Sequence, residues 1–427
     1  MRPRLLCKEL RKLRNRVNLG AALAALSLLG LASGALAQTD ACGPHKMTKK
    51  VDKPLAAAQT AHAAKKWDEV LVKVAEAEAV PVEKNPYDLF WIHEFRGIAS
   101  VNLKKFTEGQ ADLEASFNSP CMEEADKPKR ATLIMQLAYQ NKDYVKAIDY
   151  GKRSLALDPN AEIGSYLANA YYITNDFENA RRVSTDVIAK GEASGKTPEE
   201  NLYRILQSAC INLKDNACVE AQAEKLVLHY AKPNYWMDLT NTLMRVSSND
   251  KELLNIYRLA DGVGVMQEAA QYTEMAQLAL GQGLPGEAQS VIEKGMQKGA
   301  FNAAREKDLA SRILADAKQA VTLDKSTLSK QDALARTKPT GDSDVKLGAA
   351  YLSYGEVDKA IEALQRGIAK NGVKDPDEAA MLLGIAYMRA NNKPEAAKAF
   401  RTVTQKPMMV RIAKFWLLNA ESAPAAG

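Results

Sequence analysis

The stretch AYYITNDFENA, residues 170–180, decides the fold of this 427-residue chain. Close relatives of this phrase recur as AYLSYGEVDKA at residues 350–360 and AYMRANNKPEA at residues 386–396. Each copy has 11 residues, opens with Ala-Tyr, closes with Ala and carries a polar or Gly-containing break in its middle. A phrase that recurs in this way predicts a chain of repeated structural units, whereas length alone would suggest two or three globular domains.

Apolar residues on both sides of the break recur every three or four positions, which is typical of amphipathic helices. Ile163 and Leu167 share a face before the break in the first copy, and Phe177 and Val183 share a face after it. Helix, turn and helix together take about 34 residues. The sequence therefore predicts a series of helical hairpins.

The positions of small and aromatic residues within these units resemble those of the tetratricopeptide repeat. That family has a small residue at the eighth position, Tyr at the eleventh and Ala at the twentieth. Small side chains allow two helices to pack 8 to 10 Å apart. The matching residues are Ala168, Tyr171 and Ala180; Gly348, Tyr351 and Ala360; and Gly384, Tyr387 and Ala396. Residues 232–239 and 272–295 are also similar to segments of exported proteobacterial tetratricopeptide proteins.

The resemblance implies an all-α fold, a right-handed α-solenoid of antiparallel helix hairpins. The eighth positions are assigned to Gly97, Met135, Ala168, Ala209, Ala276, Gly348 and Gly384. The steps from Ala209 to Ala276 and from Ala276 to Gly348 are 67 and 72 residues, about twice the repeat length. They predict degenerate repeats at 234–260 and 304–336. We therefore expect about ten hairpins, with a capping helix at 406–419.

Residues 1–37 have the pattern of a signal peptide, with a basic start, an uncharged stretch at 17–36 and an A-x-A site at 35–37. Cleavage after Ala37 would release a periplasmic protein that begins at Gln38. The alternative is an uncleaved membrane anchor, because about 20 apolar residues can span a bilayer.

The remaining chain is expected to divide into five parts. They are a disordered or extended segment at 38–53, a repeat array at 54–320, a polar linker or hinge at 321–344, a C-terminal repeat pair with its capping helix at 345–420, and a disordered tail at 421–427.

The net charge of +6 comes entirely from the predicted signal peptide. The full chain has 58 basic and 52 acidic residues, and residues 1–37 contain seven and one of these, which leaves 51 of each. A neutral mature chain lacks the electrostatic signature of nucleic-acid binding.

Four cysteines remain after removal of Cys7 with the signal peptide. An even number of cysteines in an exported chain predicts two disulfides, and we expect the pairs Cys42–Cys121 and Cys210–Cys218. Buried free thiols are the alternative.

The sequence contains patterns that resemble nucleotide-binding motifs, but their spacing or their flanking elements do not match those motifs. GEASGKT, residues 191–197, has one residue too few between its glycines for a phosphate loop. GQGLPG, residues 281–286, lies between two predicted helices, whereas a dinucleotide site needs a preceding strand. The four histidines have no metal-ligand spacing. The sequence predicts no cofactor, no metal site and no enzymatic activity.

The expected function is a scaffold or adaptor that binds an envelope protein or peptide through the concave side of the array. Family positions that face this side are occupied by Gln136, Tyr139, Asn169, Tyr172 and Gln277. Packing between repeats is the alternative role for Tyr139 and Tyr172. Two other functions stay open: an envelope-assembly or TonB-like energy-transduction accessory that is attached to the membrane through 17–36, and an enzyme with its site in 304–344.

Overall fold

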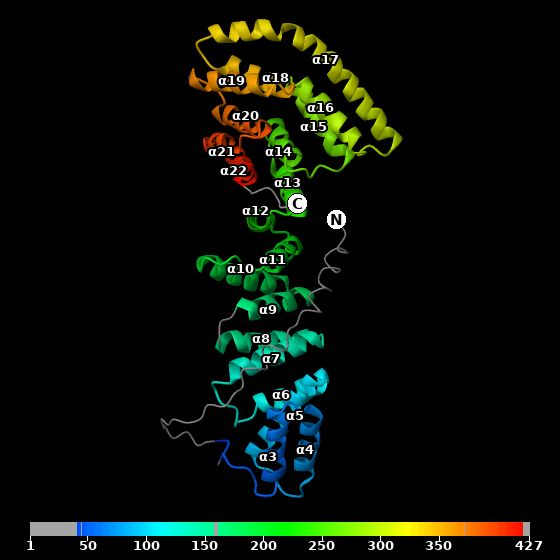
Figure 1. Ribbon diagram of the computed structural model, residues 1–427, viewed down its shortest axis with the longest axis vertical. Helices are drawn as coiled ribbons and strands as arrows, with labels where there is room; N and C mark the ends of the chain where they lie inside the picture. The colour runs from blue at the N-terminus through cyan, green and yellow to red at the C-terminus, as the bar shows by residue number, and fades with distance from the viewer. Residues whose placement is uncertain (1–40, 44, 158–160, 371, 422–427) are drawn as a thin grey trace. The chain divides into compact units, whose positions relative to one another are not determined.

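The computed structural model describes residues 41–43, 45–157, 161–370 and 372–421 (Figure 1). These residues form 20 α-helices and contain no strand, so the expected all-α fold is confirmed. The predicted signal peptide at 1–37 lies outside the described residues, as does the predicted tail at 421–427 except for Glu421, which is the last residue of a helix. Within the described part, no helix is both long enough and apolar enough to cross a bilayer.

The chain forms two compact units that divide between Val219 and Glu220, within helix α12 (Asn216–Tyr230). Unit 1 contains four consecutive hairpins and then α11, which a tight turn joins to α12. Its helices are α3 (Asp52–Ala63), α4 (Trp67–Ala79), α5 (Pro86–Asn102), α6 (Phe106–Phe117), α7 (Lys127–Gln140), α8 (Tyr144–Leu157), α9 (Ala161–Ile173), α10 (Phe177–Ala193) and α11 (Glu200–Asn212).

Unit 2 also contains four hairpins, which makes nine hairpins in the described chain when α11–α12 is counted. Two further helices, α17 and α22, stand outside these pairs. The helices are α13 (Pro233–Val246), α14 (Asp250–Gly262), α15 (Ala269–Gly281), α16 (Pro285–Gln297), α17 (Ala304–Thr337), α18 (Asp342–Ser353), α19 (Val357–Ala369), α20 (Pro376–Arg389), α21 (Lys393–Arg401) and α22 (Pro407–Glu421).

The polar or Gly-containing break is a left-handed turn in eight of the nine hairpins of the described chain, and the exception is α13–α14. Asn175 has φ 60°, and the following Asp176 N–H donates to the Tyr171 carbonyl at 2.9 Å. This bond closes the end of the first helix, as in a Schellman motif. The same conformation recurs at Lys65, Lys104, Lys142, Lys214, Gly283, Gly355 and Asn391.

Small residues permit close contact between the two helices of a hairpin. A Cβ added to Gly348 would lie 2.5 Å from Cγ of Leu364, and one added to Gly384 would lie 2.3 Å from Cε1 of Phe400. Both distances are shorter than real carbon contacts, so a larger residue would push the helices apart. The repeated phrase therefore contains the turn, and the small residue two positions before the phrase permits the close helix spacing.

Helix α17 corrects two expectations. Residues 304–336 were expected to form a hairpin and 321–344 a linker or hinge, but α17 is one helix of 34 residues that ends at Thr337. It contains neither Gly nor Pro, and none of its residues has a positive φ. Leu328 and Ala335 are its only fully buried residues after Ala317 among those described, which explains the weak apolar pattern. In Figure 1, α17 passes over α15 and α16 and reaches α18.

Helix α22 closes unit 2 instead of only capping the last hairpin. It packs on α20 and α21, and also on α14 near the beginning of the unit. The Trp416 ring fills the space beside Gly262 and stacks on Phe400 at 5.7 Å. Arg411 forms ion pairs with Glu220 at 3.3 Å and with Glu224 at 2.8 Å. The last helix of unit 2 therefore contacts its first helices.

Both expected disulfides are present, which excludes the free-thiol alternative. Cys42 is bonded to Cys121, which joins the segment before α3 to the loop after α6. Cys210 is bonded to Cys218 across the α11–α12 turn. A cross-link of this kind stabilises a protein by about 2–4 kcal/mol.

The left-handed turns predict a stabilising substitution. Lys142 is exposed and has φ 64°, a conformation that costs an L-residue about 1–2 kcal/mol but costs glycine almost nothing. After the entropy of glycine in the unfolded chain is subtracted, Lys142→Gly should raise the free energy of unfolding by about 0.5–1 kcal/mol. Urea unfolding followed by circular dichroism measures this change.

Lys152→Gly is the matched control, because Lys152 is exposed within α8. Glycine inside a helix should lower the free energy of unfolding by about 0.5–1 kcal/mol. Equal destabilisation by both substitutions would show that the Lys142 conformation stores no strain.

Candidate interaction site

Four of the five residues expected to face a partner lie together in unit 1. Gln136 and Tyr139 are on α7, and Asn169 and Tyr172 are on α9; these are the first helices of consecutive hairpins and they contact each other. Gln277 is exposed on α15 in unit 2. The α7–α9 contact is therefore the centre of the candidate site.

Tyr139 packs between the two hairpins. Its ring lies edge-on to Tyr144 at 5.5 Å and to Tyr166 at 5.4 Å. Burial, together with Tyr144 and Tyr166, raises the pKa of the Tyr139 hydroxyl well above its ordinary value, so it stays protonated. Tyr172 contacts Phe177 within its own hairpin at 5.7 Å. Packing between repeats, the alternative role, thus describes the ring contact of Tyr139 with Tyr166, whereas the Tyr172 contact lies within one hairpin.

Asn169 connects α9 to Tyr139 and keeps unused hydrogen-bonding capacity. Its Nδ2 donates to the Tyr139 hydroxyl at 2.5 Å. The residue is only 6% exposed, and its Oδ1 is buried without a donor among the described residues. A buried polar atom in this state costs about 1–3 kcal/mol.

The turns correct the repeat register in α11. In α9, the left-handed Asn175 follows the eighth position, Ala168, by 175 − 168 = 7 residues, and Lys142 follows Met135 by the same 142 − 135 = 7. The turn residue after α11 is Lys214, so the eighth position is Gln207. Ala209, chosen because it is small, is therefore two residues out of register.

The corrected register adds Arg204, Ser208 and Ile211 to the candidate site. They are equivalent to Ser165, Asn169 and Tyr172 on α9, and α9 contacts α11. The sequence did contain the signal: a Lys or Asn followed by Asp marks the turn at 142–143, at 175–176 and at 214–215. We name the nine equivalent positions the A-helix strip: Thr132, Gln136, Tyr139, Ser165, Asn169, Tyr172, Arg204, Ser208 and Ile211.

The α11 end of the A-helix strip carries a cation and an exposed apolar side chain. The Arg204 guanidinium is half-buried and has no hydrogen-bond or ion-pair partner among the described residues. Ile211, one helical turn beyond Ser208, is 58% exposed. These side chains offer both charge and apolar area to a ligand.

Polar side chains of unit 2 are instead used within the unit. Arg258 of α14 forms a two-point ion pair with Glu287 of α16, at 2.9 and 2.7 Å, and both side chains are buried. Glu378 of α20 accepts from Asn255 Nδ2 at 3.0 Å, and Arg389 of α20 donates to the Leu352 carbonyl at 2.8 Å. This network joins α14, α16, α18 and α20.

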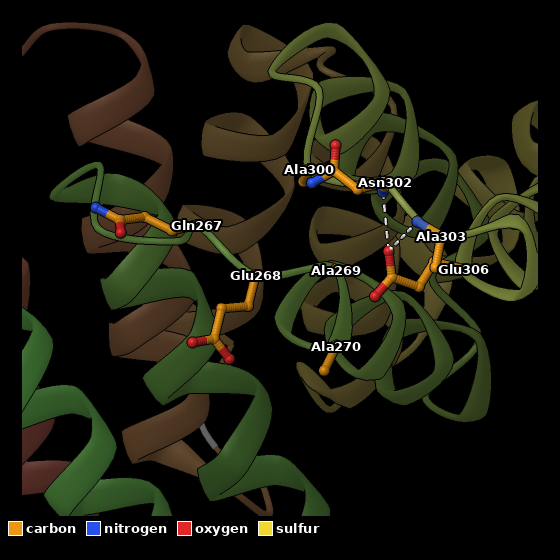
Figure 2. A pocket seen from close by; sticks show the side chains of 8 residues that line it. All are labelled: Gln267, Glu268, Ala269, Ala270, Ala300, Asn302, Ala303 and Glu306. Carbon is orange, nitrogen blue, oxygen red and sulfur yellow. Dashed lines mark hydrogen bonds between the residues drawn. The ribbon is translucent and has the colours of Figure 1, made fainter. Parts of the chain in front are cut away.

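One pocket of about 400 Å³ lies at the N-terminal ends of α15 and α17 (Figure 2). The Glu306 carboxylate accepts from the backbone N–H groups of Asn302 and Ala303, both at 2.9 Å, and these bonds lower its pKa. Four of the eight lining residues are alanines, so the pocket offers few groups for chemistry. Elsewhere in the described chain, no set of three or more His, Cys, Asp or Glu residues is arranged to hold a metal ion.

The sequence pattern of the tetratricopeptide repeat matches residues 345–407, which contain α18–α21. No curated protein matches the chain. Similar solved structures include a TPR2AB-domain:pHSP90 complex of yeast Sti1, at 14% identity over 63% of this chain and 98% of that one, with a TM-score of 0.33. A tetratricopeptide repeat protein from Parabacteroides merdae has 14% identity over 70% of this chain and 98% of that one, with a TM-score of 0.32.

Consecutive helix hairpins with small residues at their contacts and a repeated left-handed turn define the α-solenoid class of helical repeat proteins. Within that class, residues 345–407 match the tetratricopeptide repeat. Proteins of this class present surfaces on which other proteins assemble.

The buried ion pair of unit 2 yields a prediction about stability. Arg258→Met removes the cation and leaves the Glu287 carboxylate buried without its main partner, which should lower the free energy of unfolding by about 3–5 kcal/mol. Adding Glu287→Met should recover most of that loss, because two apolar side chains then replace the pair. Chemical denaturation of the single and double variants measures both changes.

Arg312→Ala serves as the control, because the Arg312–Asp308 pair is exposed and should contribute about 0–1 kcal/mol. A single Arg258 variant as mild as the control, or a double variant worse than the single, would contradict this account.

Acid should weaken the same pair. Burial alone would raise the pKa of Glu287, but its ion pair and hydrogen bonds with Arg258 lower it below the ordinary value of 4.5. A depressed folded-state pKa gives stability that is present above pH 4.5 and is lost as the pH falls through the folded value. The free energy of unfolding of the wild type should therefore fall more steeply below pH 4.5 than that of the double variant. Parallel slopes would contradict this.

Proposed function

We propose that this protein is a non-enzymatic periplasmic adaptor that binds an extended segment of an envelope protein along the A-helix strip of unit 1. The observation that carries the proposal is the state of the A-helix strip. It keeps a half-buried guanidinium without a described partner and an exposed isoleucine.

The composition of the A-helix strip suits a protein ligand. Tyr and Arg are the side chains most often responsible for interface affinity. Burial of a side chain such as Ile211 would contribute about 1.5–3 kcal/mol, and Arg204 would attract a carboxylate of the partner. Hydroxyls and amides at the other positions add hydrogen bonds that favour a peptide over an apolar small molecule.

The disulfides support a location outside the cytoplasm. Cys42–Cys121 and Cys210–Cys218 include all the cysteines after Cys7, and such bonds persist in oxidising compartments. The signal-peptide pattern of residues 1–37 favours the same location.

Site-specific photocrosslinking tests the ligand surface. A photoreactive residue in place of Ser208 should crosslink to a discrete envelope protein in cells that make this protein. The same residue in place of Val145, which is 76% exposed on the second helix of a hairpin, is the control. Arg204→Ala combined with Ile211→Asp should reduce the Ser208 crosslink at least tenfold. Equal crosslinking from both positions, or no effect of the double change, would refute the proposed surface.

Intact-mass measurement tests the location. The protein recovered from the periplasmic fraction should begin at Gln38 and lack residues 1–37. A full-length chain recovered with membranes would instead favour the membrane-attached alternative.

A further inference from the structure

We infer that Tyr139 and Asn169 bind a main-chain peptide unit of the ligand, through one N–H and one C=O group. This inference rests on the proposed function, because it assigns a specific contact within the A-helix strip. It depends on the hydrogen-bonding groups that the pair leaves unused.

The pair makes one hydrogen bond and retains donors and an acceptor next to each other. When Nδ2 of Asn169 donates to the Tyr139 hydroxyl, the hydroxyl hydrogen, the second Nδ2 hydrogen and Oδ1 of Asn169 remain available. If the amide is turned over, the hydroxyl donates to Oδ1, and both Nδ2 hydrogens and the hydroxyl oxygen remain. Both orientations leave at least one donor beside one acceptor.

A peptide unit complements this arrangement. It offers one N–H donor and one C=O acceptor, both of which need partners when buried. A carboxylate or phosphate would offer only acceptors, and an ammonium group would offer only donors. The neighbouring Thr132 and Ser165 are neutral, so the α7–α9 part of the A-helix strip does not select a charged group.

Access requires only a local movement. Asn169 is 6% exposed, and Tyr139 beside it is half-buried. The terminal torsion of an asparagine has a broad energy minimum, so the amide can turn toward an arriving peptide while it keeps its contact with Tyr139. Binding would then satisfy the atom that has no partner in the free protein.

N-methylation of a peptide tests the contact directly. The probe is the 12-residue peptide most enriched by phage display against the full chain, synthesised unmodified and with each backbone nitrogen methylated in turn. Calorimetry should find one position where methylation weakens binding to the wild type at least tenfold. Against Tyr139→Phe, the unmodified peptide should bind at least fivefold more weakly, and methylation at that position should cost less than twofold.

Two further variants make the result specific. Asn169→Ala should behave like Tyr139→Phe. Tyr144→Phe is the matched control, because it removes a hydroxyl from the same aromatic group and should change affinity less than twofold. Circular dichroism checks that each variant is folded. If Asn169→Ala does not fold, Tyr139→Phe still tests the contact, because it keeps the packed aromatic ring.

The outcomes separate the inference from the proposed function. Equal methylation penalties in the wild type and in Tyr139→Phe would overturn the inference while peptide binding stands. A second outcome would also overturn the inference. If replacing an Asn or Gln of the peptide abolished binding while no N-methylation weakened it, the contact would be to a side-chain amide and not to the main chain. Failure to enrich a peptide, or undiminished binding to the Arg204→Ala and Ile211→Asp double variant, would overturn the proposed function itself.

Discussion

The left-handed turn inside eight of the nine described hairpins is the constraint on which the other features depend. One residue with positive φ ends the first helix, and the following N–H closes it, as Asp176 does on the Tyr171 carbonyl. The turn returns the chain at a fixed register, so the eighth residue of the first helix meets the second helix. That register decides which side chains lie between hairpins and which remain available to a ligand, including Arg204 and Ile211 on α11.

The same hairpin serves different purposes in the two units. In unit 2, polar residues of α14, α16 and α20 bond to one another, and α22 returns to α14, so the unit is stabilised by its own long-range contacts. In unit 1, each hairpin mainly contacts the next one in sequence. Such contacts satisfy the apolar faces but leave the A-helix strip partly unmatched, which is a property of a binding surface.

Sequence reasoning succeeded where the signal is local. The Ala-Tyr phrase contains the turn and the small residues in a few positions, and the disulfide pairs follow from nearness in the chain or from being the remaining pair. It failed for α17, because a polar helix and a polar linker have similar composition and only the lack of Gly and Pro separates them. Ala209 was misassigned because smallness was used as the marker when the turn at Lys214 defines the register.

The bond between Tyr139 and Asn169 could not be predicted in the same way, because it joins residues 30 positions apart and depends on how two hairpins pack. Its energetics also differ from those of the buried Arg258–Glu287 pair. In the Arg258–Glu287 pair, each charge has its partner, so the attraction within the pair offsets the free-energy cost of burying the two charges. At Asn169, an unmatched oxygen costs about 1–3 kcal/mol, a sizeable fraction of the 5–15 kcal/mol that typically stabilises a domain. A leucine would fill such a position without that cost, and this difference is the reason for the proposed contact of the amide with a ligand.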